Sequence, residues 1–229
     1  MEQDFSLFDE TAASFAAWVD KLIAMGRYRR GECFVEAARS MVPAGGHILD
    51  YGCGPGRISA LLAGCGFRVL GVDPSPAMIE AARQQPHRSP DMTFETATEP
   101  PIGNAFGGFD AIVCSSVIEY ESEPDRLLQR FFSALCPQGT LIISFANSQS
   151  AWRRLFHKRN MMLGAQRQTW AWGGFRDLLV RNGFNPVRVP VYYETAFDRF
   201  ALLRFLAGSR FVGPLGLAVA TKDASFSSK

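Results

Sequence analysis

The chain has 229 residues, of which 47% are hydrophobic and 20% are charged, a balance typical of one globular domain and not of a disordered chain. Its acidic N-terminus is followed by no cleavable apolar segment, and no apolar run is long enough to span a bilayer, which argues against a signal peptide and a membrane helix. Five cysteines without regular spacing and only three histidines favour reduced thiols in a cytoplasmic protein and no metal site.

Residues 5–42 open with Phe5-Ser6-Leu7-Phe8 and predict two amphipathic helices ahead of the core. Two roles are open for these helices. They form a lid over a ligand, or they simply cover one face of a sheet.

From residue 48 onward, strand-like apolar runs alternate with helical patterns, which is the order that a mostly parallel sheet requires. The strands are expected at 48–51, 68–72, 92–94, 110–115, 140–145, 187–192 and 217–221. The helices are expected at 56–64, 76–84, 124–135 and 173–181. Pro76 and Pro124 suit first helical turns, and Gly183 suits a helix exit. The predicted fold is α/β, with a doubly wound seven-stranded sheet.

The segment Asp50-Tyr51-Gly52-Cys53-Gly54-Pro55-Gly56 joins the first expected strand to the first core helix. Its glycines allow sharp turns and a close approach of the backbone to a ligand, while the helix after them offers free N–H groups. The next strand ends in Asp73, seventeen residues after Gly56, where a carboxylate can accept bonds from ribose hydroxyls. The pattern therefore predicts a nucleotide-type cofactor, with Cys53 as a small filler of the loop.

The glycine spacing also separates two kinds of cofactor. A dinucleotide fingerprint is G-x-G-x-x-G, and here the third glycine comes one residue earlier. Asp50 directly before the loop would repel a pyrophosphate but suits an ammonium group.

Together with Gly71-Val72-Asp73-Pro74-Ser75-Pro76-Ala77-Met78, this loop resembles the class I S-adenosylmethionine-dependent methyltransferases. The similarity is strongest to the small-molecule branch that includes the quinone-biosynthesis enzymes. It runs from residue 48 to 147 and reappears at Gly183-Phe184. It implies a Rossmann-like sheet that ends in an antiparallel hairpin, S-adenosylmethionine as cofactor and S-adenosylhomocysteine as product. One domain would span 1–229, with N-terminal helices in 1–44, the cofactor-binding core in 45–147 and acceptor-side elements in 148–229.

The resemblance also implies site residues. The loop would face the methionine moiety, Asp73 the ribose, and Pro74 and Met78 the adenine. Thr96 and Ala97 occupy the place where the family usually has an acid for the adenine amino group. The cofactor residues are thus Asp50, Gly52, Cys53, Gly54, Gly56, Asp73, Pro74, Met78, Thr96, Ala97 and Ser115, the last at the exit of the fourth strand.

Methyl transfer depends mainly on in-line placement of the acceptor, and a general base is needed only for an acceptor that is protonated at neutral pH. Three residues are candidates for this role. Glu119 and Tyr120 follow the fourth strand, with Tyr120 where many relatives have histidine, and His157 lies beyond the fifth. The alternatives are cofactor contact or strand-end packing for the first two, and an exposed surface histidine for the third.

The charge is divided unevenly along the chain. Residues 1–147 have 11 Lys+Arg and 18 Asp+Glu, a net charge of −7, whereas residues 148–229 have 13 and 4, a net charge of +9. The basic third begins with Trp152-Arg153-Arg154-Leu155-Phe156-His157-Lys158-Arg159 and would attract an anionic acceptor. A solvated basic face is the alternative. Trp170-Ala171-Trp172 would close over a flat or apolar substrate. The segment 197–211 would cover the substrate or contact a membrane surface, with ordinary packing against the sheet as the alternative. Aromatic residues outside the core pattern would line a pocket or a homodimer interface.

The sequence favours O-methylation of a small, anionic or lipid-like aromatic acceptor. N- or C-methylation, a nucleotide-cofactor oxidoreductase and a non-catalytic S-adenosylmethionine-binding subunit are the alternatives. Nucleic acid is disfavoured, because the total charge is only +2 and no base-methylation motif is present.

Overall fold

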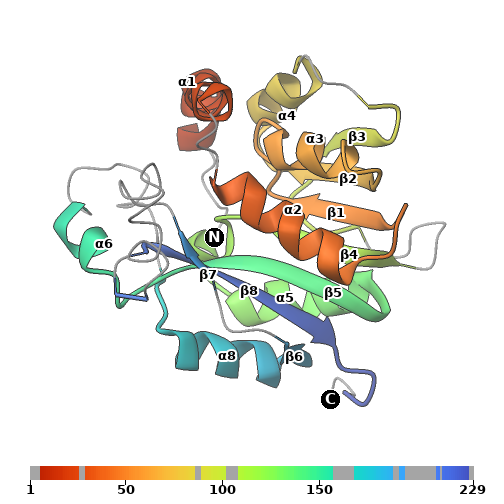
Figure 1. Ribbon diagram of the computed structural model, residues 1–229, viewed down its shortest axis with the longest axis vertical. Coiled ribbons are helices and arrows are strands. Elements are labelled where there is room, and N and C mark those ends of the chain that lie inside the picture. Colours follow the sequence, from red (N-terminus) through yellow and green to blue (C-terminus); the bar gives the residue numbers. More distant parts are fainter. Residues whose placement is uncertain are drawn as a thin grey trace.

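A computed structural model describes residues 6–25, 29–85, 89–101, 108–156, 168–187, 191–193, 210–211 and 213–226. Its centre is one sheet with the strand order β3-β2-β1-β4-β5-β8-β6, and β7 also pairs with β8 (Figure 1). The strands are β1 (His47–Tyr51), β2 (Arg68–Asp73), β3 (Met92–Thr96), β4 (Phe109–Cys114), β5 (Leu135–Ala146), β6 (Phe184–Pro186), β7 (Val191–Tyr193) and β8 (Leu215–Lys222). The first five are parallel, and β8 runs antiparallel to β5, β6 and β7. The predicted α/β class and the antiparallel end of the sheet are therefore confirmed.

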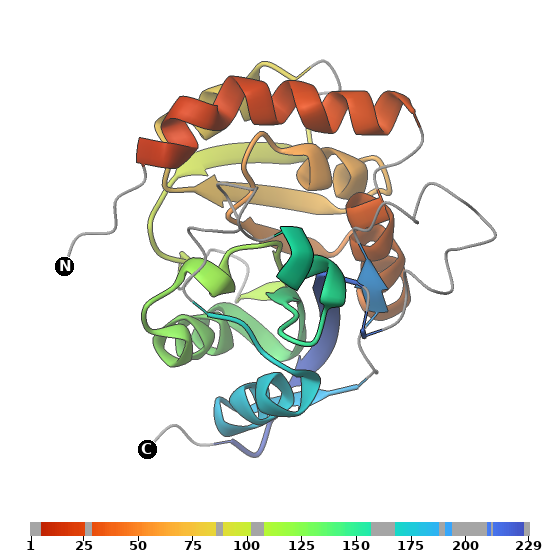
Figure 2. The ribbon, with the colours of Figure 1, turned by 90° about the vertical axis from the view of Figure 1, so that its left-hand side faces the viewer.

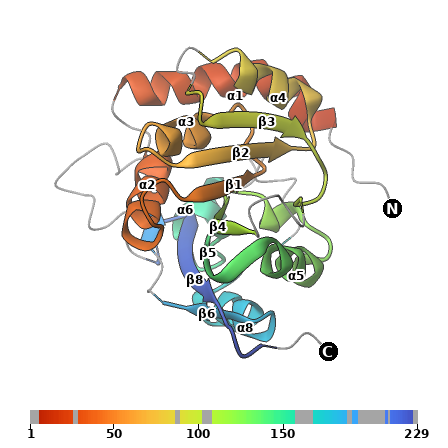
Figure 3. The same cartoon turned by 90° about the vertical axis from the view of Figure 1, so that its right-hand side faces the viewer.

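The central strands are apolar along most of their length because helices cover both faces of the sheet. In β1, Ile48 pairs with Val69 on one side and Ala111 on the other, and Ile48 itself is fully buried. The described helices are α1 (Ser6–Ala24), α2 (Arg29–Met41), α3 (Arg57–Ala63), α4 (Pro76–Arg83), α5 (Pro124–Ala134), α6 (Ala151–Phe156) and α8 (Trp172–Arg181), with a short 3₁₀ helix η1 (Ile118–Tyr120). Helices α2 and α3 pack on one face of the sheet, and α5 and α8 pack on the other (Figure 3).

The helix boundaries follow local signals in the sequence. Pro76 begins α4 directly after Ser75, whose side chain accepts a hydrogen bond from the Met78 N–H and so caps the helix. Pro124 begins α5 in the same way. Helix α8 ends just before Gly183, whose φ of 83° is the left-handed conformation that glycine provides at a helix exit.

The edge strand after α8 differs from the prediction. We expected one strand at 187–192, but two short strands, β6 and β7, lie along the same edge of β8. Pro186 pairs with Ala220 and Val191 pairs with Leu217. Between these two pairs the edge segment advances by five residues, whereas β8 advances by only three. Pro186 at the end of β6 has no N–H and removes one ladder donor, which favours a sheet edge for this segment and an interruption of its pairing. The sheet therefore has the seven positions expected, with the last one divided.

The two helices expected in residues 5–42 are present as α1 and α2, and they have different roles. Helix α2 covers the sheet, with Phe34 and Ala38 fully buried among strand residues. Helix α1 instead lies along α4 and forms the top of the molecule in the view of Figure 2. In the described part of the chain, no helix is long and apolar enough to cross a membrane.

Candidate functional site

The glycine loop lies at the carboxyl end of β1, between β2 and β4. The Gly52 and Cys53 N–H groups both donate to the carbonyl of Val72, at 2.8 and 3.0 Å. Gly52, Gly54 and Gly56 have φ values of 71°, 52° and 73°, which only glycine adopts without strain. A Cβ on Gly52 would lie 2.2 Å from Val117 Cγ2. The loop therefore needs glycine both for its backbone conformation and for its contact with the segment after β4.

Asp73 ends β2 and joins the two cofactor loops. Its carboxylate accepts the Gly54 N–H at 2.8 Å and the Ser75 N–H at 2.9 Å, one on each oxygen. Burial raises the pKa of this carboxyl, while the two backbone hydrogen bonds oppose that shift. Each carboxylate oxygen has a second lone pair, so Asp73 can hold the loops and accept ribose hydroxyls as well.

Asp50 is buried behind the same loop, with 1% of its surface exposed. Ser59 donates to its Oδ2 at 2.6 Å, whereas Oδ1 accepts no hydrogen bond from the described residues. Burial raises the pKa of Asp50 to about 7, with partial opposition from the Ser59 hydrogen bond and a further increase from the charge of Asp73. An ammonium group would satisfy Oδ1 and stabilise the charged carboxylate. Asp50 could therefore hold the ammonium group at the methionine end of S-adenosylmethionine.

The other predicted cofactor residues surround these two acids. Met78 is buried on α4, with its sulfur 3.9 Å from where a Cβ on Gly54 would stand. Cys53 is buried, and burial raises its thiol pKa well above the usual value, so it suits the filler role and not that of a nucleophile. Thr96 is exposed and pairs with Asp73, and the Ala97 N–H donates to the Asp73 carbonyl at 3.1 Å. Pro74 lies between Asp73 and the cap of α4.

The exit of β4 contains a residue that the sequence did not reveal. Ser116 has a φ of 57°, uncommon outside glycine, and its N–H donates to Ser144 Oγ at 2.7 Å. The hydroxyls of Ser115 and Ser116 are buried and make no hydrogen bond with the described residues. Such strained positions cluster at functional sites. Serine leaves no pattern in the sequence that would predict this conformation.

The structure brings two of the three candidate bases together. Glu119 and Tyr120 lie on η1, where Glu119 is fully buried and Tyr120 packs edge-on against Phe8, with 5.5 Å between ring centroids. Arg153 on α6 is buried near both residues. Burial lowers the pKa of Arg153, and the charge of Glu119 opposes that shift. His157 lies outside the described residues. Arg153 had appeared in the sequence only as one member of a basic run.

The aromatic segment before α8 packs against the sheet. Trp172 stacks on Phe145 with 6.2 Å between the ring centroids, and the ring centroids of Trp170 and Phe175 are 5.4 Å apart. The Trp170 N–H donates to the carbonyl of Ala146 at the end of β5 at 2.9 Å. Ordinary packing therefore accounts for these contacts. Of the segment 197–211, only residues 210–211 are described.

Among the described residues, no group of three or more His, Cys, Asp or Glu side chains is arranged to hold a metal ion. The site instead consists of two acids, a glycine loop and the serine-rich exit of β4.

A Rossmann-like sheet with acids at the ends of β1 and β2 and this loop defines a class I S-adenosylmethionine-dependent methyltransferase. A family model for the methyltransferase domain matches residues 25–189, and the chain belongs to this family. Its cofactor is S-adenosylmethionine.

Relatives agree with this assignment. The chain is similar to a ubiquinone biosynthesis O-methyltransferase of Xanthomonas campestris pv. campestris, with 32% identity over 123 residues, 50% of this chain and 48% of that protein. It is also similar to a trans-aconitate 2-methyltransferase of Paracidovorax citrulli, with 34% identity over 118 residues, 49% of this chain and 43% of the relative. The chain spans about half the length of the curated relatives it matches.

A solved S-adenosylmethionine-dependent methyltransferase from Thermotoga maritima has the same fold. The TM-score is 0.70 at 18% identity, covering 96% of this chain and 100% of the other.

Proposed function

We propose that this protein transfers a methyl group from S-adenosylmethionine to a small-molecule acceptor. The observation that carries the proposal is the pair of buried acids joined by the glycine loop: Asp73 bound to the loop, and Asp50 with one buried oxygen that accepts no hydrogen bond from the described residues. These are the groups that an adenosyl sulfonium with an amino-acid tail requires.

The residues of the chain would bind and orient the cofactor. Asp50 would receive the ammonium group, Asp73 the ribose hydroxyls, and Pro74 and Met78 would contact the adenine. The bound cofactor supplies an electrophilic methyl group with its own leaving group. The remaining task of the protein is to hold the acceptor in line and to exclude water.

We further propose that the acceptor is an anionic or lipid-like aromatic molecule that is methylated on oxygen. Three observations support this proposal: the basic C-terminal third, the buried Arg153 beside η1, and the two relatives, whose names give a quinone-pathway O-methylation and a carboxylate acceptor. Glu119 and Tyr120 are the described candidates for taking the proton of a hydroxyl acceptor. A panel of phenols, carboxylates, amines and quinones, with mass detection of an added methyl group, tests the acceptor class.

The Asp73→Ala variant tests the cofactor site. Loss of the ribose acceptor should weaken S-adenosylhomocysteine binding by about 1–3 kcal/mol, the cost of losing buried hydrogen bonds. Isothermal titration calorimetry measures this change. Glu95→Ala removes an exposed acid from the adjacent strand β3 and should leave the affinity unchanged.

Two results would contradict the proposal. Equal affinity of Asp73→Ala and wild-type protein would exclude Asp73 as the ribose ligand. Tight binding of NAD with no binding of S-adenosylmethionine would favour the oxidoreductase alternative.

A further inference from the structure

We propose that helix α1 is a latch that controls exchange of the cofactor, and that the Asp20–Arg57 ion pair is its catch. This inference rests on the proposed function. Helix α1 touches each of the three segments that form the site, and the contacts come from residues along most of its length.

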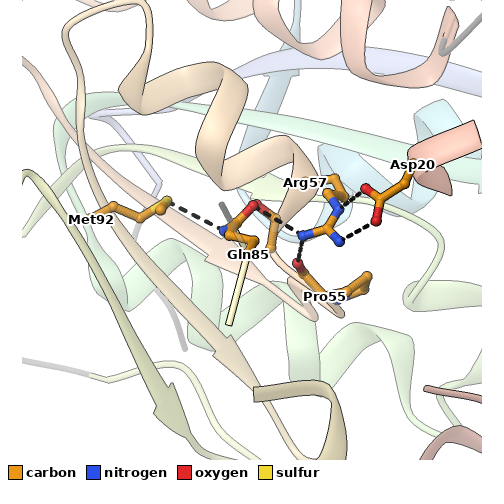
Figure 4. Close-up of polar contacts among 6 residues, drawn as sticks. Asp20, Pro55, Arg57, Gln85 and Met92 are labelled. Carbon is orange, nitrogen blue, oxygen red and sulfur yellow. Dashed lines mark hydrogen bonds and ion pairs between the residues drawn. The ribbon is translucent and has the colours of Figure 1, made fainter. Parts of the chain in front are cut away.

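The catch joins α1 directly to the glycine loop. Arg57, the first residue of α3, is buried and donates from Nε and Nη2 to the two carboxylate oxygens of Asp20, at 2.6 and 2.7 Å (Figure 4). The same guanidinium donates from Nη1 to the carbonyl of Pro55 at 3.1 Å and to Gln85 at 3.2 Å. The Arg57 side chain thus binds both the backbone of the glycine loop and helix α1, so a movement of α1 would be coupled to a movement of the loop.

Two more contacts lie over the ribose end of the site. Asp9 of α1 accepts a hydrogen bond from Ser75 Oγ, and Ser75 is the residue whose N–H binds Asp73. The Phe15 ring lies 4.0 Å from where a Cβ on Gly54 would stand. Since Gly54 also donates its N–H to Asp73, each of these two contacts joins α1 to a residue that is hydrogen-bonded to the proposed ribose ligand.

A fourth contact reaches the acceptor side. Phe8 packs edge-on against Tyr120 of η1. Helix α1 therefore spans the loop after β1, the loop after β2 and the segment after β4, and it must separate from them for a cofactor to enter or leave.

The attachment of α1 is suited to opening. Its outer surface carries the exposed apolar side chains Trp18 and Ile23, and the Asp20 side chain is 51% exposed. Solvent and salt can therefore reach the carboxylate of the catch. Helix α1 also buries Ala12 and Val19, so its opening would break apolar as well as polar contacts. Lid opening sets the rate of ligand release in many enzymes.

The test is the dissociation rate of the cofactor from the full chain. Protein loaded with radiolabelled S-adenosylmethionine is chased with excess S-adenosylhomocysteine, and the release of label is followed. Asp20→Asn removes the charge from the catch at a half-exposed position, and we expect release to accelerate by about two- to fivefold, the range of an exposed ion pair. Glu10→Gln removes a charge from an exposed position on the same helix and should release at the wild-type rate.

A second measurement separates a latch from a general loss of structure. Higher salt should accelerate release from the wild-type protein and leave Asp20→Asn little changed. Hydrogen exchange should show α1 protected by S-adenosylhomocysteine in the wild type and less protected in the variant, with equal protection of β1 and β4.

The outcomes distinguish the two proposals. If the wild-type protein binds S-adenosylmethionine and Asp20→Asn releases it at the wild-type rate, the latch is wrong and the proposed function stands. If the wild-type protein binds neither S-adenosylmethionine nor S-adenosylhomocysteine, both are wrong.

Discussion

At the scale of single residues, the fold strongly changes the acidity of Asp50. Its pKa is raised to about 7 because the carboxyl is buried, and Ser59 offsets only part of that shift. Without a cationic partner, this carboxyl is therefore largely protonated below neutral pH. An ammonium group beside Oδ1 would reverse this preference, so the proposed role of Asp50 would link cofactor binding to proton release.

We predict that S-adenosylhomocysteine binding at pH 6 releases about one proton from the wild-type protein, because the ligand favours ionised Asp50. The affinity should then rise as the pH increases from 6 toward 7 and level off above it. Calorimetry in two buffers of different ionisation enthalpy measures the released proton. Asp50→Asn has the same shape but no titrating group, and should release none.

The same residue affects stability without ligand. A carboxyl whose pKa is higher in the folded than in the unfolded protein stabilises the fold when protonated. That contribution is complete below the unfolded pKa of about 4 and is lost as the pH rises through about 7. Urea unfolding of the ligand-free proteins should therefore show wild type losing stability relative to Asp50→Asn between pH 5 and 7.5. Parallel pH profiles would mean that Asp50 titrates normally.

At the scale of elements, the glycine loop and the exit of β4 are built against each other. Gly52 and Gly45 have nearly equal φ values of 71° and 72°, but a Cβ on Gly52 meets Val117 whereas one on Gly45 meets nothing within 4 Å. Alanine at both positions adds the same backbone strain. We predict that Gly52→Ala lowers the free energy of unfolding by about 1–3 kcal/mol more than Gly45→Ala, the cost of overpacking.

Urea denaturation measures this difference, and a double variant identifies its cause. Val117→Ala should restore part of the stability of Gly52→Ala, because it removes the atom that the new Cβ meets. Equal losses at Gly45 and Gly52 would show that backbone strain alone requires the glycine.

The elements of the parallel half were predictable because several local signals agreed. Strands β1, β2 and β4 are largely apolar. Helix α3 begins directly after Gly56, α4 directly after Ser75, and α5 at Pro124, residues with known preferences for helix starts. The positions of Asp50 and Asp73 follow directly, since each acid lies at the carboxyl end of a strand. The two acids and their loop were therefore visible in the sequence.

The rest depended on contacts between distant segments. Nothing local shows that Asp20 meets Arg57, 37 residues away, or that Ser144 fixes the backbone of Ser116. The single edge strand predicted at 187–192 was wrong because the apolar pattern does not show where pairing with β8 is interrupted. Tryptophans such as Trp170 and Trp172 occur both in ligand pockets and in protein cores, and only tertiary packing distinguishes the two cases.

At the scale of the whole molecule, the basic residues of the C-terminal third have different surroundings. Some of the basic residues pair with acids of the first half: Arg181 of α8 donates two hydrogen bonds to Asp125 of α5, at 2.7 and 2.8 Å, and holds the pKa of that carboxyl below its usual value. Arg153 lies elsewhere, buried beside η1 on the proposed acceptor side. A long-range positive field and a buried guanidinium together favour an acceptor with a carboxylate.

We therefore predict that the protein loaded with S-adenosylhomocysteine binds 3,4-dihydroxybenzoate at least about tenfold more tightly than catechol, which has the same ring diol but no carboxylate, since a charge-assisted hydrogen bond contributes about 1.5–3 kcal/mol. Raising the salt concentration should reduce this advantage without changing the affinity for catechol. Calorimetric titration of both ligands over a salt series measures the two effects.

Matched arginine variants assign the effect to a position. Arg153→Gln should remove most of the preference for the carboxylate, whereas Arg154→Gln, at an exposed position one residue further along α6, should reduce it only slightly. Because Arg153 is buried near Glu119, S-adenosylhomocysteine binding by Arg153→Gln is measured first to verify the fold. Equal affinity of the wild-type protein for the two ligands at low salt would show that the basic third is a solvated surface, and the acceptor would then have to be recognised without its charge.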